Sequence, residues 1–436
     1  MVKIIHMADT HLGYRARRGA INQWSIENYS RPYEQEIYDT FLDVMTEISK
    51  MDDLDFVIHC GDMFHQPSER NPFPPNEPAR RVLKKGLDIF FKNTENKVPF
   101  IYIEGNHGIF KGYDYTPFES HISQKKYPEL YYFKEGDLKN AINEQKPLQV
   151  EFPRKQSRFY LFPYFEFNNF EVYKNAYDKW VYNQQPSNND DFINIAVAHG
   201  SPLDHSLHEK VLSDDFNYDY IALGHEHGLK AQTKNRYFSG SLLPLNFKEI
   251  YKSHGYIIVD VNSGEEDLEI KKIKTDKLLK RSFEEREVRI SPQESTIELK
   301  EKIQQILDDY KSEEGFNANT AGRVKIKFEG EMSIEKVWQI NELMVQFRRS
   351  CFSKIDKYNI LQLIWKTSDI SAYVEEDSSP GVIEDFILEE PEKEFRSFVE
   401  EKLTENKTKF DISKLTKFGI AAIKDALEIM DTEEEV

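Results

Sequence analysis

The sequence predicts an α/β protein built around a sheet that is at least partly parallel and covered on both faces. Short apolar runs alternate with stretches whose apolar residues recur at helical spacing, which indicates strands alternating with helices. Strands joined through helices favour parallel pairing, with helices on the faces of the sheet. The chain has 436 residues, too many for one ordinary hydrophobic core, so we expect two or three domains.

The first elements follow one another in strand–helix order. The run "KIIHMA" predicts a buried strand, and the spacing of apolar residues over 33–51 predicts an amphipathic helix. A strand at 53–62, a helix at 79–94 and a strand at 98–108 are predicted next. Further apolar runs predict strands at 157–165, 193–200, 218–227 and 255–261.

A domain boundary is expected near residues 275–285. Beyond it, 286–310 and 322–347 each look like a strand followed by a helix, which suits a small α/β domain. An acidic stretch with Ser, Pro and Gly then indicates a linker. The predicted parts are a first domain at 1–280, a small α/β domain at 285–370, the linker at 371–390 and a helical segment at 391–436.

Each of the two short helices predicted in the C-terminal segment carries an apolar face. Phe395 and Phe398 lie on the face of the first, and Leu415 and Phe418 lie on that of the second. After an acidic linker, such faces either fold back on the body of the protein or dock on a partner. The residues alone leave both possibilities open.

The composition indicates the cellular compartment of the protein but says little about its binding partner. Two cysteines, Cys60 and Cys351, cannot build a disulfide framework, which favours a reducing compartment. No apolar run reaches membrane-span length, so we expect a cytoplasmic protein, or a nuclear one in a eukaryote, that is not secreted and has no membrane partner. The net charge of −18 neither supports nor excludes DNA, because basic clusters such as Arg80, Arg81, Lys84 and Lys85 remain.

Five predicted strands end in side chains that bind metals. The corners are "ADTH" (Asp9, His11), "CGDMFH" (Asp62, His65), "EGNHG" (Asn106, His107), "AHGSP" (His199) and "LGHEH" (His225, His227). In an open α/β sheet, ligand sites form at the carboxyl ends of the strands, so these side chains are expected to converge.

The residue types at these corners suit divalent transition metals. Imidazole with carboxylate and amide oxygen favours Mn, Fe or Zn, whereas an all-oxygen set would favour Mg or Ca. The set is too large for one ion but fits two ions that share a carboxylate. Asp62 is the natural bridge, since a short carboxylate at a strand end can give one oxygen to each ion. Such a pair can clamp both the attacking and the leaving oxygens of a phosphoryl displacement.

The ordered motifs DxH, GDxxH, GNH, a lone His and GHxH resemble those of the calcineurin-like metallophosphoesterase superfamily. "ADTHLGYR" with "GDMFH" and "GNH" narrows the resemblance to the SbcD-like double-strand-break repair nucleases, which include the meiotic-recombination-eleven homologues. It covers roughly residues 1–250. The resemblance implies a two-sheet core flanked by helices, a small α/β capping domain and a C-terminal helical segment.

The resemblance also implies a role for each corner residue. The metal ligands would be Asp9, His11, Asp62 and His227 for one ion, and Asp62, Asn106, His199 and His225 for the other. His107 would act as general acid or electrostatic stabiliser, and His65 would position the bound strand. One departure stands out: the family usually continues GNH with an acidic residue, and this chain has Gly108.

The activity implied is that of a Mn²⁺-dependent DNA nuclease with two bound ions, acting as exonuclease on double-stranded DNA and as endonuclease on single strands or hairpins. Its partners would be DNA ends, a second copy of the chain, and an SMC-like coiled-coil ATPase of the SbcC type held by the C-terminal helices. ATP would act through that partner, because the chain has no GxxxxGK[ST] motif. From their place after the first corner, Arg15, Arg17 and Arg18 would either contact phosphates near the metals or form a solvated basic loop.

Two other functions remain open on the sequence. One is a phosphatase or small phosphodiesterase on the same core, although the phosphatase motifs GDxxDRG and GNHE are absent. The other is a non-catalytic scaffold that binds DNA ends and the ATPase, which Gly108 favours. Among the remaining histidines, His6 and His59 are expected to be satisfied core or supporting residues, while His205, His208 and His254 are expected at the surface.

Overall fold

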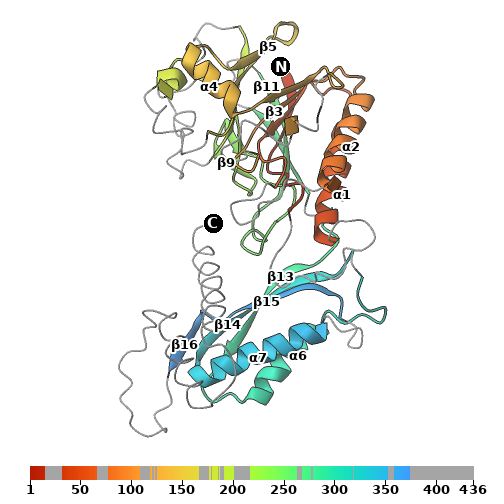
Figure 1. The fold of residues 1–436 in the computed structure, drawn as a ribbon, viewed down its shortest axis with the longest axis vertical. Coiled ribbons are helices and arrows are strands. Elements are labelled where there is room, and N and C mark those ends of the chain that lie inside the picture. The colour runs from red at the N-terminus through yellow and green to blue at the C-terminus, as the bar shows by residue number, and fades with distance from the viewer. Residues whose placement is uncertain are drawn as a thin grey trace, which may run out of the picture. The chain divides into compact units, whose positions relative to one another are not determined.

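The computed structural model describes most of the chain up to Tyr373 (Figure 1). The described residues are 1–14, 32–65, 77–108, 118–119, 122, 125–165, 176–177, 179–184, 186, 191–200, 217–262, 268–275, 278–317, 319–351 and 358–373. Four groups of predicted features lie outside them: Arg15, Arg17 and Arg18; His205 and His208; most of the predicted linker; and the helical segment with Phe395, Phe398, Leu415 and Phe418.

The first sheet has six strands in the order β12-β11-β1-β2-β3-β4. They are β1 (Val2–Met7), β2 (Phe56–Cys60), β3 (Phe100–Ile103), β4 (Leu130–Phe133), β11 (Gly255–Val261) and β12 (Glu269–Lys274). The strands from β1 to β4 run parallel, while β11 and β12 pair antiparallel. The carboxyl ends of β1, β2 and β3 therefore meet at one edge, where Asp9, Asp62 and Asn106 follow them.

The second sheet also has six strands, in the order β5-β6-β7-β8-β10-β9. They are β5 (Gln149–Phe152), β6 (Ser157–Phe162), β7 (Ile193–His199), β8 (Tyr220–Gly224), β9 (Lys230–Thr233) and β10 (Arg236–Phe238). Its central strands β6, β7 and β8 are parallel. Their carboxyl ends carry His199, the last residue of β7, and His225 and His227, which follow β8.

The two sheets pack against each other, so their central strands are buried on both faces. Ile58 of β2 and Val197 of β7 lie in the apolar cluster between the sheets. The neighbouring Val57 faces α1 (Pro32–Ile48) and α2 (Glu77–Asn93), which lie side by side on the outer face of the first sheet (Figure 1). Ala198 faces the cluster under α4 (Glu135–Glu144). Burial on both faces explains why these strands read as unbroken apolar runs.

A third sheet forms the small α/β domain. Its strands are β13 (Phe283–Ile290), β14 (Gly322–Ser333), β15 (Ile360–Lys366) and β16 (Ile370–Tyr373), and every pairing is parallel. The helices α6 (Thr296–Asp308) and α7 (Ile334–Cys351) cover it (Figure 1). A capping box starts α6, since Ser295 and Glu298 satisfy each other's backbone N–H groups. The predicted fold class, an α/β two-sheet core with a small α/β domain, is confirmed.

Buried arginines join the third sheet to the first domain. The Arg281 guanidinium lies 2.5 Å from the Glu36 carboxylate of α1, and both side chains are almost fully buried. Arg281 also donates to the Ala321 carbonyl at 2.7 Å. Arg323 of β14 stacks 3.9 Å from the centre of the Phe283 ring and donates to the Leu245 carbonyl of the first domain at 3.3 Å. These contacts fix the third sheet against α1 and the segment after β10.

Several elements were not predicted, namely β4, α4, β5, β9, β10, β12, β15 and β16. Two of those at sheet edges are polar: β9 reads "KAQT" and β12 reads "EIKKIK". Such strands exist because a neighbour offers a backbone ladder, which local residue preference does not encode. Among the residues that the structure describes, no helix is both long and apolar enough to cross a membrane.

Breaking the Arg281–Glu36 pair is expected to destabilise the protein. Arg281→Met leaves the Glu36 carboxylate buried without its cation, and we expect a loss of about 3 kcal/mol in the free energy of unfolding. Lys280→Met is the control, because Lys280 is exposed and its Nζ lies 4.0 Å from Asp39 at the surface. Denaturation of the full chain followed by circular dichroism measures both variants. Equal losses would show that the buried pair has no special role.

Candidate metal centre

Four corner residues have positive φ angles, a backbone conformation that residues other than glycine rarely adopt. The φ angles of Asp9, His11, Asp62 and His225 are 49°, 48°, 55° and 92°. Left-handed residues of this kind cost roughly 1–2 kcal/mol each and cluster at functional sites. Backbone hydrogen bonds hold two of the corners together: Asp9 N–H donates to Gly61 O at 3.1 Å and His11 N–H donates to Asp62 O at 3.0 Å. The first two corners are thus built as one unit.

Two glycines let the second sheet approach this unit. A Cβ atom at Gly61 would overlap the imidazole of His199, and one at Gly224 would overlap the carbonyl oxygen of Cys60. Gly61 also has a φ of 92°, which glycine adopts without strain. Glycine at these two positions therefore allows His199 of the second sheet to reach under the corners of the first.

The first donor group consists of Asp9, His11 and His227, whose ligand atoms all lie within 4.8 Å of one another. His227 Nδ1 lies 3.0 Å from a Glu249 carboxylate oxygen, which can only accept, so Nδ1 donates. The lone pair of His227 Nε2 then faces His11 Nε2 at 3.0 Å. Asp9 is held because its two oxygens accept from His225 N–H, both at 3.0 Å.

The second donor group consists of Asp62, His199 and His225, again within 4.8 Å. His199 Nδ1 donates to the Cys60 carbonyl at 2.7 Å, which leaves its Nε2 to face the donor group. That Nε2 faces two acceptors, Asn106 Oδ1 at 2.8 Å and Asp62 Oδ2 at 3.4 Å. Asn106 Oδ1 also lies 3.2 Å from His225 Nδ1, which brings the asparagine into this group.

Asp62 lies between the two groups. Its Oδ2 is 3.4 Å from His199 Nε2 in the second group and 3.8 Å from His11 Nε2 in the first. Its Oδ1 accepts from His107 N–H at 2.8 Å. The nitrogen and oxygen atoms that face one another in both groups would fit divalent cations once His199 gives up its Nε2 proton, and the mixture of imidazole, carboxylate and amide donors suits transition metals. The assignment of individual ligands stays a prediction.

The pKa shifts of the buried corner residues fit a site that would bind cations. Burial raises the pKa of Asp9 to about 6. Burial disfavours charge on His199 as well, but the nearby Asp62 carboxylate outweighs it and raises the pKa of His199 to about 9. Burial opposes ionisation of Asp62 too, yet His199 and His107 hold its pKa well below the usual range. A charged His199 thus balances Asp62 here, and bound cations would take over that balance.

His65 and His107 lie beside the donor groups. Their rings stack with centroids 4.8 Å apart, and His65 Nδ1 is 3.2 Å from His11 Nδ1. Both side chains are half-buried, so solvent or a substrate can reach them. The structure thus brings together all nine corner residues, and places these two where a molecule bound to the donor groups would contact them. Their catalytic roles stay predictions.

One supporting residue of the centre has no sequence signal. Glu249 is buried, accepts from His227 Nδ1 and also accepts from Leu245 N–H at 2.7 Å. A carboxylate behind a metal-ligating histidine fixes the tautomer and orients the ring. Glu249 lies 22 residues after His227 in no recognisable motif, so sequence reasoning missed it.

The histidines outside the corners divide between correct and wrong predictions. His6 is a satisfied core residue, since its Nε2 donates to Leu223 O at 3.1 Å and its Nδ1 accepts from the Tyr220 hydroxyl at 2.8 Å. His59 supports the centre through Thr10, whose hydroxyl lies 2.6 Å from His59 Nε2. The prediction that His254 lies at the surface is wrong. It is buried, and its two ring nitrogens are satisfied there by hydrogen bonds to Ser241 Oγ and to the Glu249 carbonyl.

The packing of Glu104 gives a reason for Gly108. A Cβ atom at position 108 would overlap Glu104 Oε1, so a side chain there has no room. Glu104 is buried and accepts from the hydroxyl groups of Tyr102, at 2.6 Å, and of Tyr132. Burial raises the pKa of Glu104 to about 7. The carboxyl group that lies behind the GNH turn in this protein therefore comes from the residue before the turn.

Comparison with known proteins agrees with this centre. The family model described as calcineurin-like phosphoesterase matches residues 2–229, more than half of the chain. The DNA double-strand break repair protein Mre11 of Methanococcus maripaludis is 32% identical over 25% of this chain and only 24% of its own length. A subunit of the nuclease SbcCD from Staphylococcus epidermidis is 23% identical over 61% of this chain and 67% of its own length. Mre11 of Methanocaldococcus jannaschii is 26% identical over 62% and 65%.

Removing the charge of Glu249 is expected to weaken metal binding. Glu249→Gln takes away the carboxylate that holds the His227 tautomer, and we expect the affinity for Mn²⁺ to fall by about 10- to 100-fold. Glu226→Gln is the matched control, since Glu226 lies between His225 and His227 but pairs with Lys230 and Lys252 at the surface. Titration calorimetry on metal-free protein measures the affinities. Similar affinities for the two variants would exclude this role.

A side chain at position 108 is expected to conflict with Glu104. Gly108→Ala should cost about 1–3 kcal/mol through overpacking. The loss in the double variant Glu104→Ala, Gly108→Ala should be smaller than the sum of the single losses, because Glu104 is the group that is displaced. Gly136→Ala is the control, where the added Cβ meets only Lys134 Cε at 3.7 Å. Denaturation gives the free energies of the two single variants, the double variant and the control, and strict additivity of the two single losses would contradict the conflict.

Proposed function

Because the chain belongs to the calcineurin-like phosphoesterase family, we propose that it is a two-metal, Mn²⁺-dependent DNA nuclease of double-strand break repair. The observation that carries the proposal is the pair of donor groups that share Asp62 between them. The names of the relatives, Mre11 and a subunit of the nuclease SbcCD, support DNA as the substrate. The activity we propose is exonuclease on double-stranded DNA and endonuclease on single strands and hairpins.

We propose the following roles for the corner residues. Asp9, His11, Asp62 and His227 would hold one ion, while Asn106, His199 and His225 would join Asp62 around the other. When bound, the metals lower the pKa of the attacking water and neutralise phosphate charge. His107 has its backbone N–H on Asp62 at 2.8 Å, so its imidazole is fixed next to the centre, where it would donate a proton to the leaving oxygen. His65, stacked on His107, would position the bound strand.

The remaining parts would serve the DNA and a partner. The capping domain at 285–370 would orient the DNA, and the contacts of Arg281 with Glu36 and of Arg323 with the Leu245 carbonyl support a fixed position for it. The segment at 391–436 would bind an SMC-like ATPase of the SbcC type, and the printed name of the staphylococcal relative, a subunit of SbcCD, supports a partner protein. We also propose a homodimer.

A non-catalytic scaffold that binds DNA ends is the rival from a different class. Gly108 favours it on the sequence alone. The overlap between a Cβ atom at 108 and Glu104 gives Gly108 a packing reason, which does not require a loss of catalysis. A phosphatase or phosphodiesterase for smaller substrates is the second rival, since it would use the same donor groups.

The test is cleavage of end-labelled linear duplex and hairpin DNA with Mn²⁺, Mg²⁺ or chelator. We expect Mn²⁺-dependent products, and we expect His107→Ala to lower the rate by about 100-fold or more, since general acid catalysis contributes about 10²- to 10⁴-fold. Metal analysis should still find two ions in the variant, because the Asp9, His11, His227 group and the Asp62, His199, His225 group stay complete without His107, although the His107 ring also lies near His11 and His65. Two bound ions without DNA cleavage would favour the scaffold, and hydrolysis of aryl phosphates alone would favour the phosphatase.

A further inference from the structure

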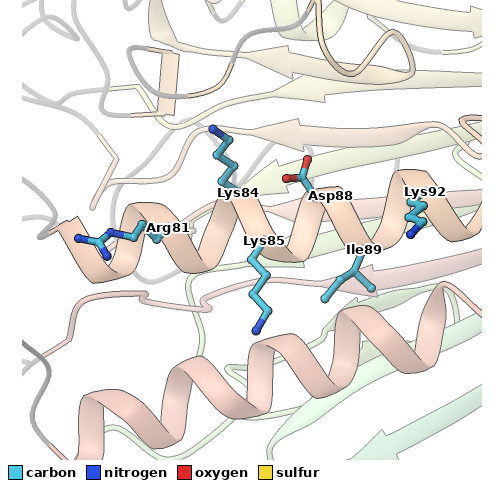
Figure 2. Close-up of a pocket in the computed structure, with 6 residues that line it drawn as sticks. All are labelled: Arg81, Lys84, Lys85, Asp88, Ile89 and Lys92. Atoms are coloured by element: carbon cyan, nitrogen blue, oxygen red, sulfur yellow. The ribbon is translucent and has the colours of Figure 1, made fainter. Parts of the chain in front are cut away.

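Helix α2 presents a row of exposed cations on one side. Arg81, Lys84, Lys85 and Lys92 are exposed and lie at spacings that share one side of a helix, and Figure 2 shows them along α2. With Asp88 and Ile89 they line an open hollow of about 310 Å³. We call these four cations the α2 cationic face.

Several lysines elsewhere in the chain pair with acids, whereas, among the residues that the structure describes, the lysines of this face have only Asp88 of the same helix near them. Elsewhere lysines pair closely, as Lys155 does with Asp55 at 2.5 Å and Lys139 with Glu135 at 3.2 Å. Within the described part of the chain, Lys84, Lys85 and Lys92 form no ion pair. A concentration of unpaired positive charge in a chain of net charge −18 indicates an anionic ligand.

The acid within the face does not neutralise it. Asp88 accepts from the Tyr127 hydroxyl at 2.6 Å and pairs with Lys126, which brings a further cation to the same region. Lys126 is itself half-exposed. The charges of Lys84, Lys85 and Lys92 therefore outweigh the single charge of Asp88, which also holds Lys126.

The chain path connects this face to the metal centre. α2 joins β2 to β3, which run parallel, so α2 begins near the carboxyl edge of the sheet and ends near the opposite edge. Asp62 and His65 follow β2 at that carboxyl edge. Arg81 thus lies toward the metal end of the helix, and Lys92 lies at the far end.

We propose that the α2 cationic face binds the sugar–phosphate backbone of duplex DNA and guides it toward the metal centre, an inference that rests on the proposed nuclease function. From residue 81 to residue 92 the helix rises roughly 16 Å at about 1.5 Å per residue. One DNA strand presents about five phosphates over that length, at roughly 3.4 Å per phosphate. Lysine, a flexible point charge, suits contact with phosphates of any sequence.

A second copy of the chain is the less suitable occupant. In a two-fold dimer the same face would meet itself, and like charges would oppose one another. The homodimer that we propose would therefore leave Lys84, Lys85 and Lys92 outside its interface.

The experiment compares two charge-matched double variants of the full chain. Lys84→Gln with Lys85→Gln removes two charges from the face, and Lys271→Gln with Lys274→Gln removes two exposed charges from β12. Anisotropy of a labelled duplex of mixed sequence is measured in chelator over a range of KCl concentrations. We expect the α2 variant to bind on the order of tenfold more weakly at about 100 mM salt, with a slope of log K against log salt reduced by about 1.8. The β12 variant should match the wild type.

The outcomes separate this inference from the nuclease proposal. If the wild type binds and cleaves DNA but the α2 variant binds like the β12 variant, the α2 inference is wrong while the nuclease stands. If the α2 variant loses affinity and the wild type does not cleave with Mn²⁺, the face is a DNA site on a scaffold. A wild type that binds no duplex overturns both. A change in oligomeric state at unchanged DNA affinity, seen by sedimentation, would assign the face to a second copy.

Discussion

The structure depends on holding the Asp62 carboxylate between two groups of donor atoms. Imidazole nitrogens of both sheets face its Oδ2, at 3.8 Å from His11 and 3.4 Å from His199. A buried carboxylate is expensive without compensating charge or hydrogen bonds. His107 N–H and a charged His199 provide that compensation in the protein alone, and metal ions would provide it in the working state. The surrounding fold can be understood as the support of this one group.

Each sheet contributes one half of that support. The first sheet brings Asp9, His11 and Asp62 on corners of left-handed backbone, whose strain the rigid strands behind them sustain. The second sheet brings His199 under those corners, which is possible only because Gly61 and Gly224 have no side chain. Since the strands are buried on both faces, neither sheet can shift without disrupting two apolar layers. The donor groups are therefore preorganised by the cores of the protein.

Charge is arranged differently inside the protein and at its surface. Inside, Arg281 forms a buried ion pair with Glu36, at the contact between the third sheet and α1. At the surface, several lysines pair with acids, as Lys139 does with Glu135 and Lys155 with Asp55, whereas Lys84, Lys85 and Lys92 on α2 form no ion pair with the residues that the structure describes. The net charge of −18 hides this difference, because a sum over the chain says nothing about where the unpaired charges lie.

The sequence by itself determined the strand–helix order of the core and the set of corner residues. Both signals are local: strands buried on two faces read as apolar runs, and the corner side chains lie at the end of a strand or within a few residues after it. Tertiary structure alone decided that Glu249 supports His227, that Glu104 excludes a side chain at 108, and that His254 is buried. It also decided the polar edge strands β9 and β12. These features arise from contacts between segments far apart in the chain, for which no local pattern of residues is required.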